Sequence, residues 1–302
     1  MGRWERALDA AGVRDSGLRA DYSRQRRQVF RFKREMTVAV GLLLPGRMVP
    51  HLIAAADFMH RTDTLLDSGP VADRRAAFAR WKQETAESLA AGRTGHPELR
   101  PLLNSVREHP ALHDRVRDYL GAATWDLDFT GFATEDDYQR YVDGYSLPGC
   151  MVVTGLVGPD GDQRGYRAAC RTFIDACQRL DFVNDLAEDL AGGRLNIPEE
   201  TLERYGVTRA DLEQGRDLPA VRAMIGDQLD QVDRAMAQCT DMVDLAPPAH
   251  RPILRCLIGT EELTSSAARA DPGALLRRSA GPPGLAALRL LGREYIQARR
   301  LA

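Results

Sequence analysis

The feature that most constrains the fold is an apolar periodicity of helical type that runs along almost the whole chain. Val49, Leu52, Ile53, Ala56 and Met59, for example, recur at the spacing of one helix face. No stretch shows the regular polar and apolar alternation typical of a strand. Short breaks rich in Pro and Gly interrupt the pattern at residues 42–47, 67–73, 108–110, 157–165, 192–198, 245–252, 270–273 and 279–284. The sequence therefore predicts an all-α fold of roughly ten helices, each of about 10 to 28 residues.

The bulk properties exclude several classes of protein. A chain of 302 residues with 44% hydrophobic residues can bury a substantial core, so disorder is excluded. No linker or internal repeat marks a boundary, and we expect one domain over residues 1–302. The net charge of -2 gives no general attraction to nucleic acid. Five cysteines without zinc spacing favour a reduced, cytoplasmic chain.

Contact with a membrane is expected to be peripheral at most. The N-terminus lacks the apolar core of a signal peptide, and no run approaches the roughly 18 apolar residues that a membrane span needs. The segment 284–302 is basic and carries an apolar stripe. It is predicted to be an amphipathic helix docked on the body of the protein, and a helix lying on a membrane surface is the alternative. The oligomeric state stays open.

Two expected helices carry carboxylates one turn apart, Asp63 with Asp67 and the row Asp181, Asp185 and Asp189. Most such groups are solvated helix face, where like charges repel by a few tenths of a kcal/mol. Here the neighbours are mostly apolar, so a cation should neutralise the acids. Oxygen ligands without a Cys/His cluster favour Mg²⁺, which completes its shell with waters and phosphate oxygens. The pattern predicts a diphosphate clamp, with surface acids or salt bridges as the alternative.

Three segments resemble motifs of the squalene and phytoene synthases, a family of isoprenoid synthases. "HRTDTLLD", which ends at Asp67, is similar to the first aspartate-rich motif of that family. "QRLDFVNDLAEDLAGGRLNIP" is similar to the second, with Asp181 in place of asparagine and Asn196 in place of tyrosine. "YVDGYSLPGCMVVTGLVG" resembles the segment between them and keeps Tyr145 and Gly149. The resemblance runs from about residue 20 to residue 278.

This resemblance implies the isoprenoid synthase helical bundle with a central hydrophobic cavity. It implies a prenyltransferase that ionises an allylic prenyl diphosphate donor. Four carboxylates are implied as Mg²⁺ ligands: Asp63, Asp67, Asp185 and Asp189. Contacts to substrate are expected from His60, Arg61, Lys33, Arg34, Gln178, Asp181, Arg194 and Arg277. For the last of these positions the neighbouring Arg278 is the alternative. Four aromatic side chains could stabilise a carbocation or could simply be part of the hydrophobic core: Phe58, Trp125, Phe129 and Phe182.

Several positions depart from the family pattern. His60 stands where the family has arginine, and Ala56, Asp143 and Thr260 stand where it has tyrosines. Losing such donors weakens the binding of a second diphosphate, because charge-assisted hydrogen bonds contribute roughly 1.5 to 3 kcal/mol each. The departures favour a small-molecule acceptor other than a second prenyl diphosphate, such as an aromatic carbazole quinone in secondary metabolism. The alternative is head-to-head condensation of two prenyl diphosphates.

The altered central segment suggests two catalytic residues. Asp143, on the hypothesis of a different acceptor, would orient or deprotonate that acceptor, with Tyr145 nearby. A surface acid on the helix that follows Asp136 and Asp137 is the alternative interpretation of Asp143.

Overall fold

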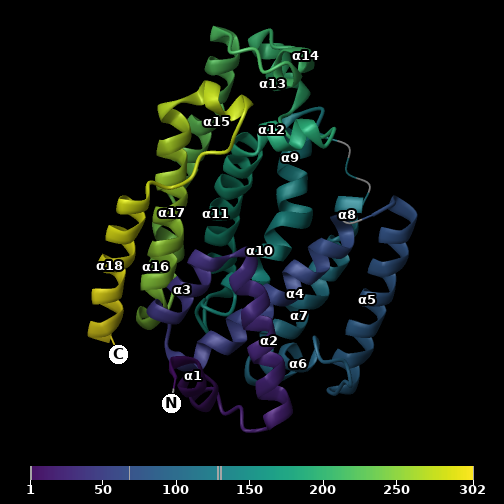
Figure 1. The fold of residues 1–302 in the computed structure, drawn as a ribbon, viewed down its shortest axis with the longest axis vertical. Helices are drawn as coiled ribbons and strands as arrows, with labels where there is room; N and C mark the ends of the chain where they lie inside the picture. The colour runs from purple at the N-terminus through teal and green to yellow at the C-terminus, as the bar shows by residue number, and fades with distance from the viewer. Residues whose placement is uncertain (1, 68, 128, 130, 302) are drawn as a thin grey trace.

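The computed structural model describes residues 2–67, 69–127, 129 and 131–301. Within these ranges every regular element is helical and no strand is present, as predicted (Figure 1). The first half contains α1 (Arg3–Ala10), α2 (Ser16–Phe32), α3 (Arg34–Leu43), η1 (Gly46–Met48), α4 (Val49–Asp67), α5 (Val71–Ala91), α6 (Arg100–Glu108), α7 (Ala111–Ala122), α8 (Thr124–Leu127), α9 (Glu135–Tyr141) and η2 (Val142–Ser146). The second half contains α10 (Leu147–Thr154), α11 (Gln163–Asn184), α12 (Leu186–Ala191), α13 (Glu199–Tyr205), α14 (Arg209–Glu213), α15 (Pro219–Met236), α16 (Thr240–Leu245), η3 (Pro248–His250), α17 (Arg251–Ala270), η4 (Pro272–Leu276) and α18 (Gly284–Leu301).

The structure divides the chain more finely than the periodicity predicts. All the expected breaks at proline and glycine are present, but the described residues form eighteen α-helices, several of them shorter than ten residues. Two of the extra starts have a local cause. Thr134 and Thr208 accept hydrogen bonds from the backbone N–H groups of Asp137 and Asp211, and those carboxylates bond back to the threonine N–H groups. Such capping boxes begin a helix wherever they occur.

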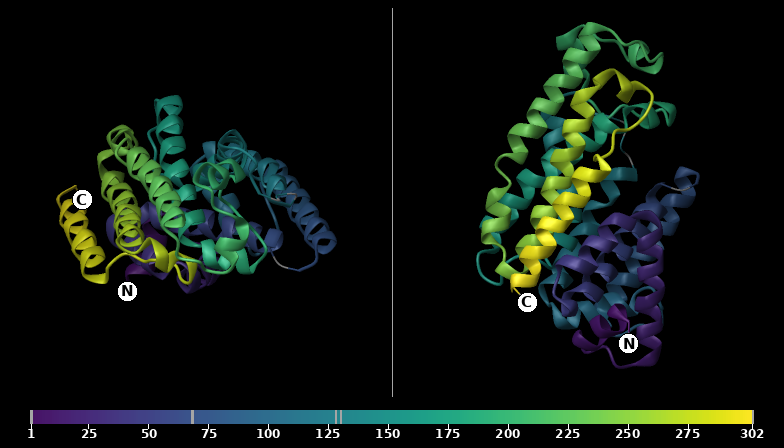
Figure 2. Two further views of the ribbon diagram at one scale, coloured as in Figure 1. Left: turned by 90° about the horizontal axis from the view of Figure 1, so that it is seen from above. Right: turned by 60° about the vertical axis from the view of Figure 1, so that its left-hand side comes forward.

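The long helices pack around a shared interior. Helix α11 packs against α10, α15 and α17, and α10 also packs against α4. Seen from above, these helices form a bundle with α18 at its outer edge (Figure 2). The largest cluster of buried apolar residues extends from Ala7 in α1 to Leu290 in α18. A single domain over residues 1–302, as the sequence predicts, requires a core of this kind.

Two interruptions shape the interior. Lys33, with φ -136 and ψ 62, separates α2 from α3, so its side chain projects from a bend between two helices. Asp185 separates α11 from α12, where one continuous helix is expected from the sequence. Helical hydrogen bonds continue across this second break. The N–H of Asp185 donates to the Asp181 carbonyl at 2.8 Å, and the N–H of Asp189 donates to the Asp185 carbonyl at 2.9 Å.

The C-terminal helix docks on the body as predicted. Helix α18 packs against α17 and α3. Leu290 is buried and lies against Gly259, whose lack of a side chain makes room for it. Nε of Arg255 donates to Oε2 of Glu294 at 2.7 Å, and Glu294 is itself buried. In the part of the chain that the structure describes, no helix is both long and apolar enough to cross a membrane.

Candidate active site

The first aspartate pair lies on the last two turns of α4. Asp63 is partly buried, and its Oδ1 accepts a hydrogen bond of 2.5 Å from the hydroxyl of Tyr119 in α7. The hydroxyl of Tyr145 in η2 donates to the same oxygen at 3.4 Å. Beside it, Nε1 of Trp81 in α5 donates to Oγ1 of the buried Thr62 at 3.0 Å, which ties this end of α4 to α5. The Asp63 carboxylate is therefore oriented by two phenols.

The second row of acids lies at the junction of α11 and α12. Oγ of Ser279 donates to Oδ1 of Asp185 at 2.7 Å, and Nδ2 of Asn196 donates to Oδ2 of Asp189 at 2.6 Å. The Ser279 segment is tied to α11 as well, because the N–H of Ala280 donates to Oδ1 of Asn184 at 2.7 Å. Each of the two carboxylates thus keeps one oxygen for a ligand beyond the protein.

The two rows meet through Arg194. Its Nη1 lies 4.0 Å from Oδ1 of Asp67, with both side chains about half exposed. Burial raises the pKa of Asp189. The hydrogen bond from Asn196 and the positive charge of Arg194 partly oppose that rise. Arg194 therefore lies between the end of α4 and α12. Arg194 interacts with an acid of each row, Asp67 and Asp189, so the two aspartate-rich segments lie near each other at this side chain.

Acids outnumber bases in the interior beside these rows. Burial raises the pKa of Asp181 to about 6, with the charge of Asp185 adding to the rise and Lys33 opposing it. Burial likewise raises the pKa of Glu261 in α17 to about 6, with Asp181 adding to the rise and Lys33 again opposing it. Asp181 is accessible to solvent and is nevertheless closely surrounded by protein, as expected of a side chain that lines an interior space.

The acids supply oxygen ligands of the kind that Mg²⁺ prefers. In the described residues, however, no group of three or more His, Cys, Asp or Glu side chains is gathered closely enough to hold a metal ion by itself. Mg²⁺ commonly binds through one or two carboxylates and takes its other ligands from water and phosphate. Burial raises the pKa of Asp189, so its ionised form is disfavoured in this position. A divalent cation bound beside it would favour the ionised form.

The predicted basic contacts divide into two groups. Lys33 lies near enough to affect Asp181, Glu261 and His60 electrostatically. The His60 ring stacks on Phe32 at a centroid distance of 3.6 Å, and burial, followed by the charge of Lys33, lowers the pKa of His60. His60 therefore does not provide the permanent charge of an arginine.

The remaining predicted substrate contacts have other partners. Nε of Arg61 lies 3.3 Å from Oε2 of Glu98. The Arg34 guanidinium lies 5.6 Å from the ring centroid of Phe30, outside the acid rows. Oε1 of Gln178 accepts a hydrogen bond from Ser146 at 2.9 Å. Hydrogen bonds from Arg222 chiefly lower the pKa of Asp217, and Arg277 adds to this effect, so Arg277 lies near Asp217.

Asp143 points away from the acid rows. Its side chain is 61% exposed, and its Oδ1 accepts a hydrogen bond of 2.9 Å from Nε of Arg171. This placement corrects the expectation that Asp143 faces the cavity, and it favours the alternative of a surface acid. Tyr145, two residues later in the π-helical turn η2, faces Asp63, because residues two apart in a helix lie on nearly opposite sides of it.

Most of the candidate aromatic side chains are packed in the core. Phe58 is buried and stacks on Trp81 at 5.7 Å. Phe129 and Phe182 belong to a cluster with Tyr141, which in turn lies 5.1 Å from the ring of Tyr145. Trp125 is 50% exposed and covers Gly144. Two of these groups reach the acid rows: the cluster of Tyr141 reaches them through Tyr145, and Phe58 reaches them through Tyr119, whose ring centroid lies 6.3 Å away.

Sequence reasoning missed three residues of this site, Tyr119, Glu261 and Ser279, and one contact, the hydrogen bond from Asn196 to Asp189. Tyr119 and Glu261 occur in ordinary helical patterns and carry no local signal. Asn196 was visible as a departure from the family motif, but the sequence did not indicate that Asn196 bonds to Asp189. These contacts depend on how separate helices pack together.

Comparison with known proteins identifies the family. Residues 33–282 match the model of the squalene/phytoene synthase family. The chain is 31% identical over 224 residues to the bifunctional protein CrtB/UppS of Streptomyces coelicolor, covering 74% of this chain and 39% of that protein. It is 28% identical over 216 residues to the chloroplastic phytoene synthase 3 of Zea mays, covering 67% and 48%. The chain thus spans less than half of the length of either relative.

The fold agrees with this assignment. A dehydrosqualene synthase in complex with a ligand superposes with a TM-score of 0.82 at 17% identity, covering 94% of this chain and 98% of the other. Squalene synthase HpnC from Alicyclobacillus acidocaldarius gives 0.76 at 24%, covering 87% and 98%. The predicted isoprenoid synthase helical fold is confirmed. The chain belongs to the squalene/phytoene synthase family, whose members are prenyltransferases.

Proposed function

We propose that this protein is a Mg²⁺-dependent prenyltransferase that condenses two prenyl diphosphates head to head into a squalene- or phytoene-type product. One observation carries the proposal, the meeting of the acids of α4 with those of α11 and α12 across Arg194. The relatives are a phytoene synthase and a CrtB/UppS protein, and a squalene synthase shares the fold. They favour this reaction over the different acceptor that the sequence departures suggest.

Asp63, Asp67, Asp185 and Asp189 would hold the metal. Bound there, Mg²⁺ would neutralise the leaving diphosphate. Tyr119 and Ser279 keep two of these carboxylates in fixed orientations. Preorganised ligands avoid the cost of ordering them when the substrate arrives.

Other side chains of the chain would bind and shield the donor. Lys33, which lies near Asp181, and Arg194, which lies near Asp67, would supply positive charge to a bound diphosphate. The allylic carbon–oxygen bond breaks, and the diphosphate leaves with the electron pair. The double bond of the second prenyl diphosphate captures the allylic cation, and loss of a proton gives an intermediate that still carries one diphosphate. Departure of that diphosphate, rearrangement of the carbon skeleton and loss of a second proton would give a phytoene-type hydrocarbon. A squalene-type product would require a hydride donor such as NADPH in place of the second proton loss. The ring faces of Tyr141 and Tyr145 are placed to stabilise positive charge, and apolar walls would exclude water.

The direct test is incubation of the purified chain with farnesyl or geranylgeranyl diphosphate and Mg²⁺. Diphosphate release and a phytoene-type hydrocarbon are the expected products, and a squalene-type hydrocarbon is expected only when a hydride donor such as NADPH is added. Asp63→Asn and Asp185→Asn should each abolish both signals. Asp143→Asn is the matched control, since this exposed acid is paired with Arg171 outside the acid rows, and it should leave turnover near normal. Failure to consume any donor length would refute the proposal.

A second candidate is transfer of the prenyl group to an aromatic acceptor such as a carbazole quinone. The observation in its favour is the stacking of His60 on Phe32, together with a lowered His60 pKa, where the family has an arginine. A site with one fixed cation fewer binds a second diphosphate less well. Diphosphate release that requires an added aromatic acceptor and gives no hydrocarbon from the donor alone would establish this reaction instead.

A further inference from the structure

The cysteines are nucleophilic side chains that the proposed reaction does not use. All five are free thiols: Cys150, Cys170, Cys177, Cys239 and Cys256. Cys150 lies on α10 and is partly buried, whereas Cys170 lies on α11 and is fully buried. Helices α10 and α11 pack against each other. Whether the two thiols can react with each other depends on how these helices face one another.

Hydrogen bonds fix the seam between α10 and α11 at two places. Oγ of Ser146 donates to Oε1 of Gln178 at 2.9 Å, and the hydroxyl of Tyr166 donates to the Thr154 carbonyl at 3.0 Å. Residue numbers rise along α10 as they fall along α11, so the two helices are antiparallel. These contacts set which residues of one helix face which residues of the other.

Cys150 and Cys170 lie between those two contacts, opposite each other. Cys150 is one turn from Ser146 and one turn from Thr154, and Cys170 is one turn from Tyr166. The Cys150 thiol acts as a hydrogen-bond donor to the Cys170 sulfur. The Cys150 sulfur also lies 3.5 Å from Oγ1 of Thr154. Two thiols in direct contact need only small side-chain rotations to form a disulfide, whose sulfurs are about 2 Å apart.

The surroundings of Cys170 favour its thiolate. The hydrogen bond from Cys150 chiefly lowers the pKa of Cys170, and burial opposes that change. Thr154 contributes a further hydrogen bond and Arg115 a positive charge. The Arg115 guanidinium fits here because Gly155 has no side chain, since a Cβ there would lie 2.5 Å from Cζ of Arg115. A thiol with a lowered pKa beside an arginine has the environment of a reactive cysteine.

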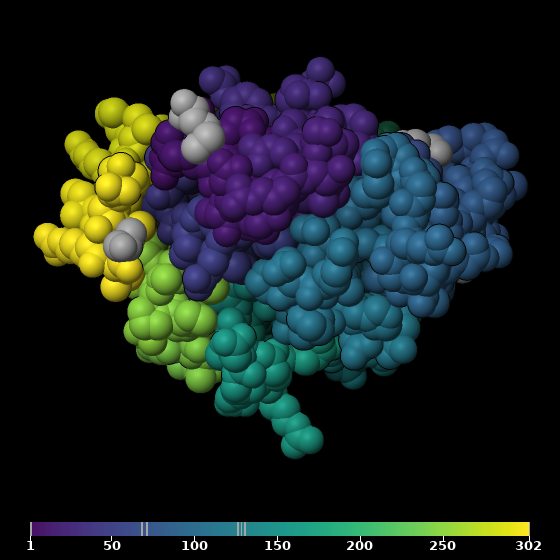
Figure 3. All heavy atoms as spheres, turned by 90° about the horizontal axis from the view of Figure 1, so that it is seen from below, coloured from purple at the N-terminus to yellow at the C-terminus, as the bar shows by residue number. Residues whose placement is uncertain are grey.

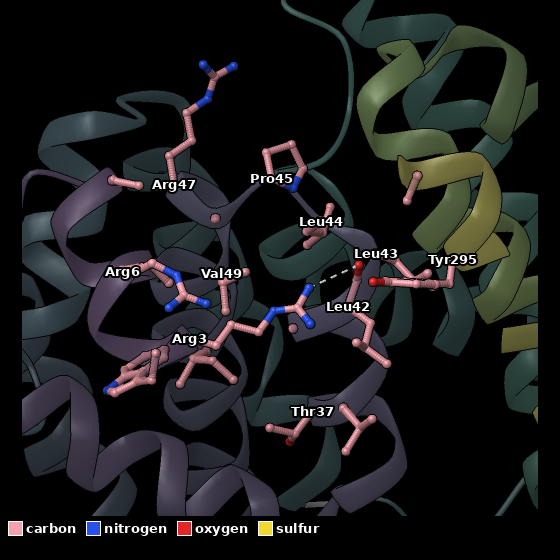
Figure 4. Close-up of a pocket in the computed structure, with 18 of the residues that line it drawn as sticks. Arg3, Arg6, Thr37, Leu42, Leu43, Leu44, Pro45, Arg47, Val49 and Tyr295 are labelled. Atoms are coloured by element: carbon pink, nitrogen blue, oxygen red, sulfur yellow. Dashed lines mark hydrogen bonds between the residues drawn. The ribbon is translucent and has the colours of Figure 1, made fainter. Parts of the chain in front are cut away.

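Two hollows lie outside the acid rows, and no cysteine of the described residues lines either of them. The larger has a volume of about 970 Å³, and Figure 4 shows Tyr295 of α18 beside Leu42 and Leu43 of α3 in its lining. Figure 3 shows that side of the molecule, where the N-terminal helices adjoin α18. The smaller lies between α9, α11 and α15. A reagent held in either hollow would not touch the thiols, so an oxidant has to be small enough to reach the partly buried Cys150 directly.

We propose that Cys150 and Cys170 form a site of reversible oxidation, at which a peroxide joins them as a disulfide between α10 and α11. One sulfur, as its thiolate, attacks a peroxide oxygen, the O–O bond breaks, and a sulfenic acid and a hydroxide result. The second sulfur then displaces hydroxide from the sulfenic sulfur, and the S–S bond forms. The two thiol protons convert both hydroxides to water. One hydrogen peroxide is thus reduced to two waters while two thiols are oxidised to one disulfide.

Helix α10 connects this pair to the two phenols that orient Asp63. Gly149, next to Cys150, lies against the ring of Tyr119, and Tyr145 is in the turn that leads into α10. Both hydroxyls donate to Asp63. A bond that fixes α10 against α11 is therefore expected to lower turnover severalfold. This effect on turnover rests on the proposed function, whereas formation of the bond does not.

Peptide mapping tests the bond without any substrate. The folded chain is treated with hydrogen peroxide, the remaining thiols are blocked, and the chain is digested with trypsin. Trypsin cleaves after Arg164 and Arg171. The three cysteines of α10 and α11 therefore fall in three different peptides. The peptides that contain Cys150 and Cys170 should be joined, and dithiothreitol should release them.

Variants and melting provide the controls. Cys150→Ser should abolish the joined peptide, whereas Cys256→Ser, at a buried cysteine of α17, should leave it unchanged. The bond should raise the melting temperature by several degrees, because it closes a loop of roughly 20 residues in the unfolded chain. If Cys150 and Cys170 stay unlinked under peroxide, or if either pairs with Cys177 instead, the proposal is overturned.

The rate of bond formation tests the part of Arg115. Arg115→Gln should slow it about 3- to 10-fold near pH 7, because each pKa unit changes the thiolate fraction by up to about tenfold. Arg117→Gln is the matched control, since Arg117 is on the same helix and 69% exposed. Equal rates in the two variants would overturn the role of Arg115.

Turnover separates this site from the proposed function. Peroxide should lower turnover of a prenyl diphosphate severalfold in the wild type and leave it unchanged in Cys150→Ser, and dithiothreitol should restore it. Unchanged turnover of the linked chain would overturn the link between the thiol pair and the acid rows. A chain that consumes no prenyl diphosphate would contradict the proposed function, and the peptide map would still decide whether the disulfide forms.

Discussion

Nη1 of Arg194, in the loop after α12, lies 4.0 Å from Oδ1 of Asp67 at the end of α4. Both side chains are about half exposed, so this ion pair contributes little to stability. Its position matters more, because it places one cation where the two acidic motifs approach each other. An incoming diphosphate with its metal would compete with Asp67 for this guanidinium.

Arg194→Gln is expected to lower kcat/KM for the prenyl diphosphate by about 10- to 100-fold, since a charge-assisted hydrogen bond contributes roughly 1.5 to 3 kcal/mol. The melting temperature should change little. Steady-state kinetics and thermal melting measure the two effects. Arg209→Gln is the control, because Arg209 donates to the Gly193 carbonyl at 2.8 Å beside Arg194 and has no acid of the site as partner. Equal losses in the two variants would mean that loop structure, rather than the Arg194 charge, is responsible.

Tyr119→Phe removes the 2.5 Å hydrogen bond to Asp63 and keeps the buried ring. We expect kcat to fall about 10-fold, because a bond to a charged group contributes roughly 1.5 to 3 kcal/mol. Tyr166→Phe is a matched control, since this buried tyrosine donates to the Thr154 carbonyl at 3.0 Å away from the acids. The control should lose comparable stability and retain full activity. If both variants keep full activity, Tyr119 does not position Asp63.

The buried Asp57 makes stability depend on pH. Burial raises its pKa from 3.8 to about 7, with the charge of Glu98 adding to the rise. The folded state holds this proton more tightly than the unfolded state, so the free energy of unfolding should fall as pH rises from about 4 to about 7. Asp57→Asn should remove that fall and stabilise the protein at pH 8 by up to about 4 kcal/mol, at about 1.4 kcal/mol per pKa unit.

Urea denaturation at pH 5 and pH 8 measures the Asp57 effect. Asp21 is the control, because it is equally buried but pairs with Arg24 at 2.8 Å and with Arg100. Asp21→Asn should destabilise the protein, since it leaves two arginines without their partner. A stability curve that is flat from pH 4 to 7 in the wild type would contradict the role of Asp57.

The metal and the diphosphate are expected to bind together. In the described residues no group of three or more His, Cys, Asp or Glu side chains could hold a metal ion by itself, so Mg²⁺ alone should raise the melting temperature only slightly. Mg²⁺ with inorganic pyrophosphate should raise it by several degrees, by mass action on the folded state. The shift should be lost with EDTA and in Asp185→Asn, and it should shrink below about pH 6, where Asp181 takes up a proton. A large shift with Mg²⁺ alone would point to a preformed site.

Much of the helical framework could be predicted because its signals are local. Proline and glycine mark the ends of α3, α6 and α12, and the spacing of Asp63 and Asp67 places them on one face of α4 wherever that helix packs. The capping boxes at Thr134 and Thr208 were also visible in the sequence. Reading them would have predicted two of the additional helices.

The rest of the site depends on contacts between distant segments. Asp143 and Tyr145 are only two residues apart, yet Arg171 of α11 draws one outward while Asp63 of α4 meets the other. Tyr119 becomes part of the site only because α7 packs against α10 beside α4. No pattern within these segments specifies such partners, since hydrogen-bond choice depends on the packing of whole helices.

Helix α4 gives the molecule a direction. Its first residue, Val49, is buried beside η1, and its last, Asp67, belongs to the acid rows, about 27 Å away at 1.5 Å per residue. A charged substrate would therefore be met at one pole of this helix, while the opposite pole is occupied by the packing of the N-terminal segments.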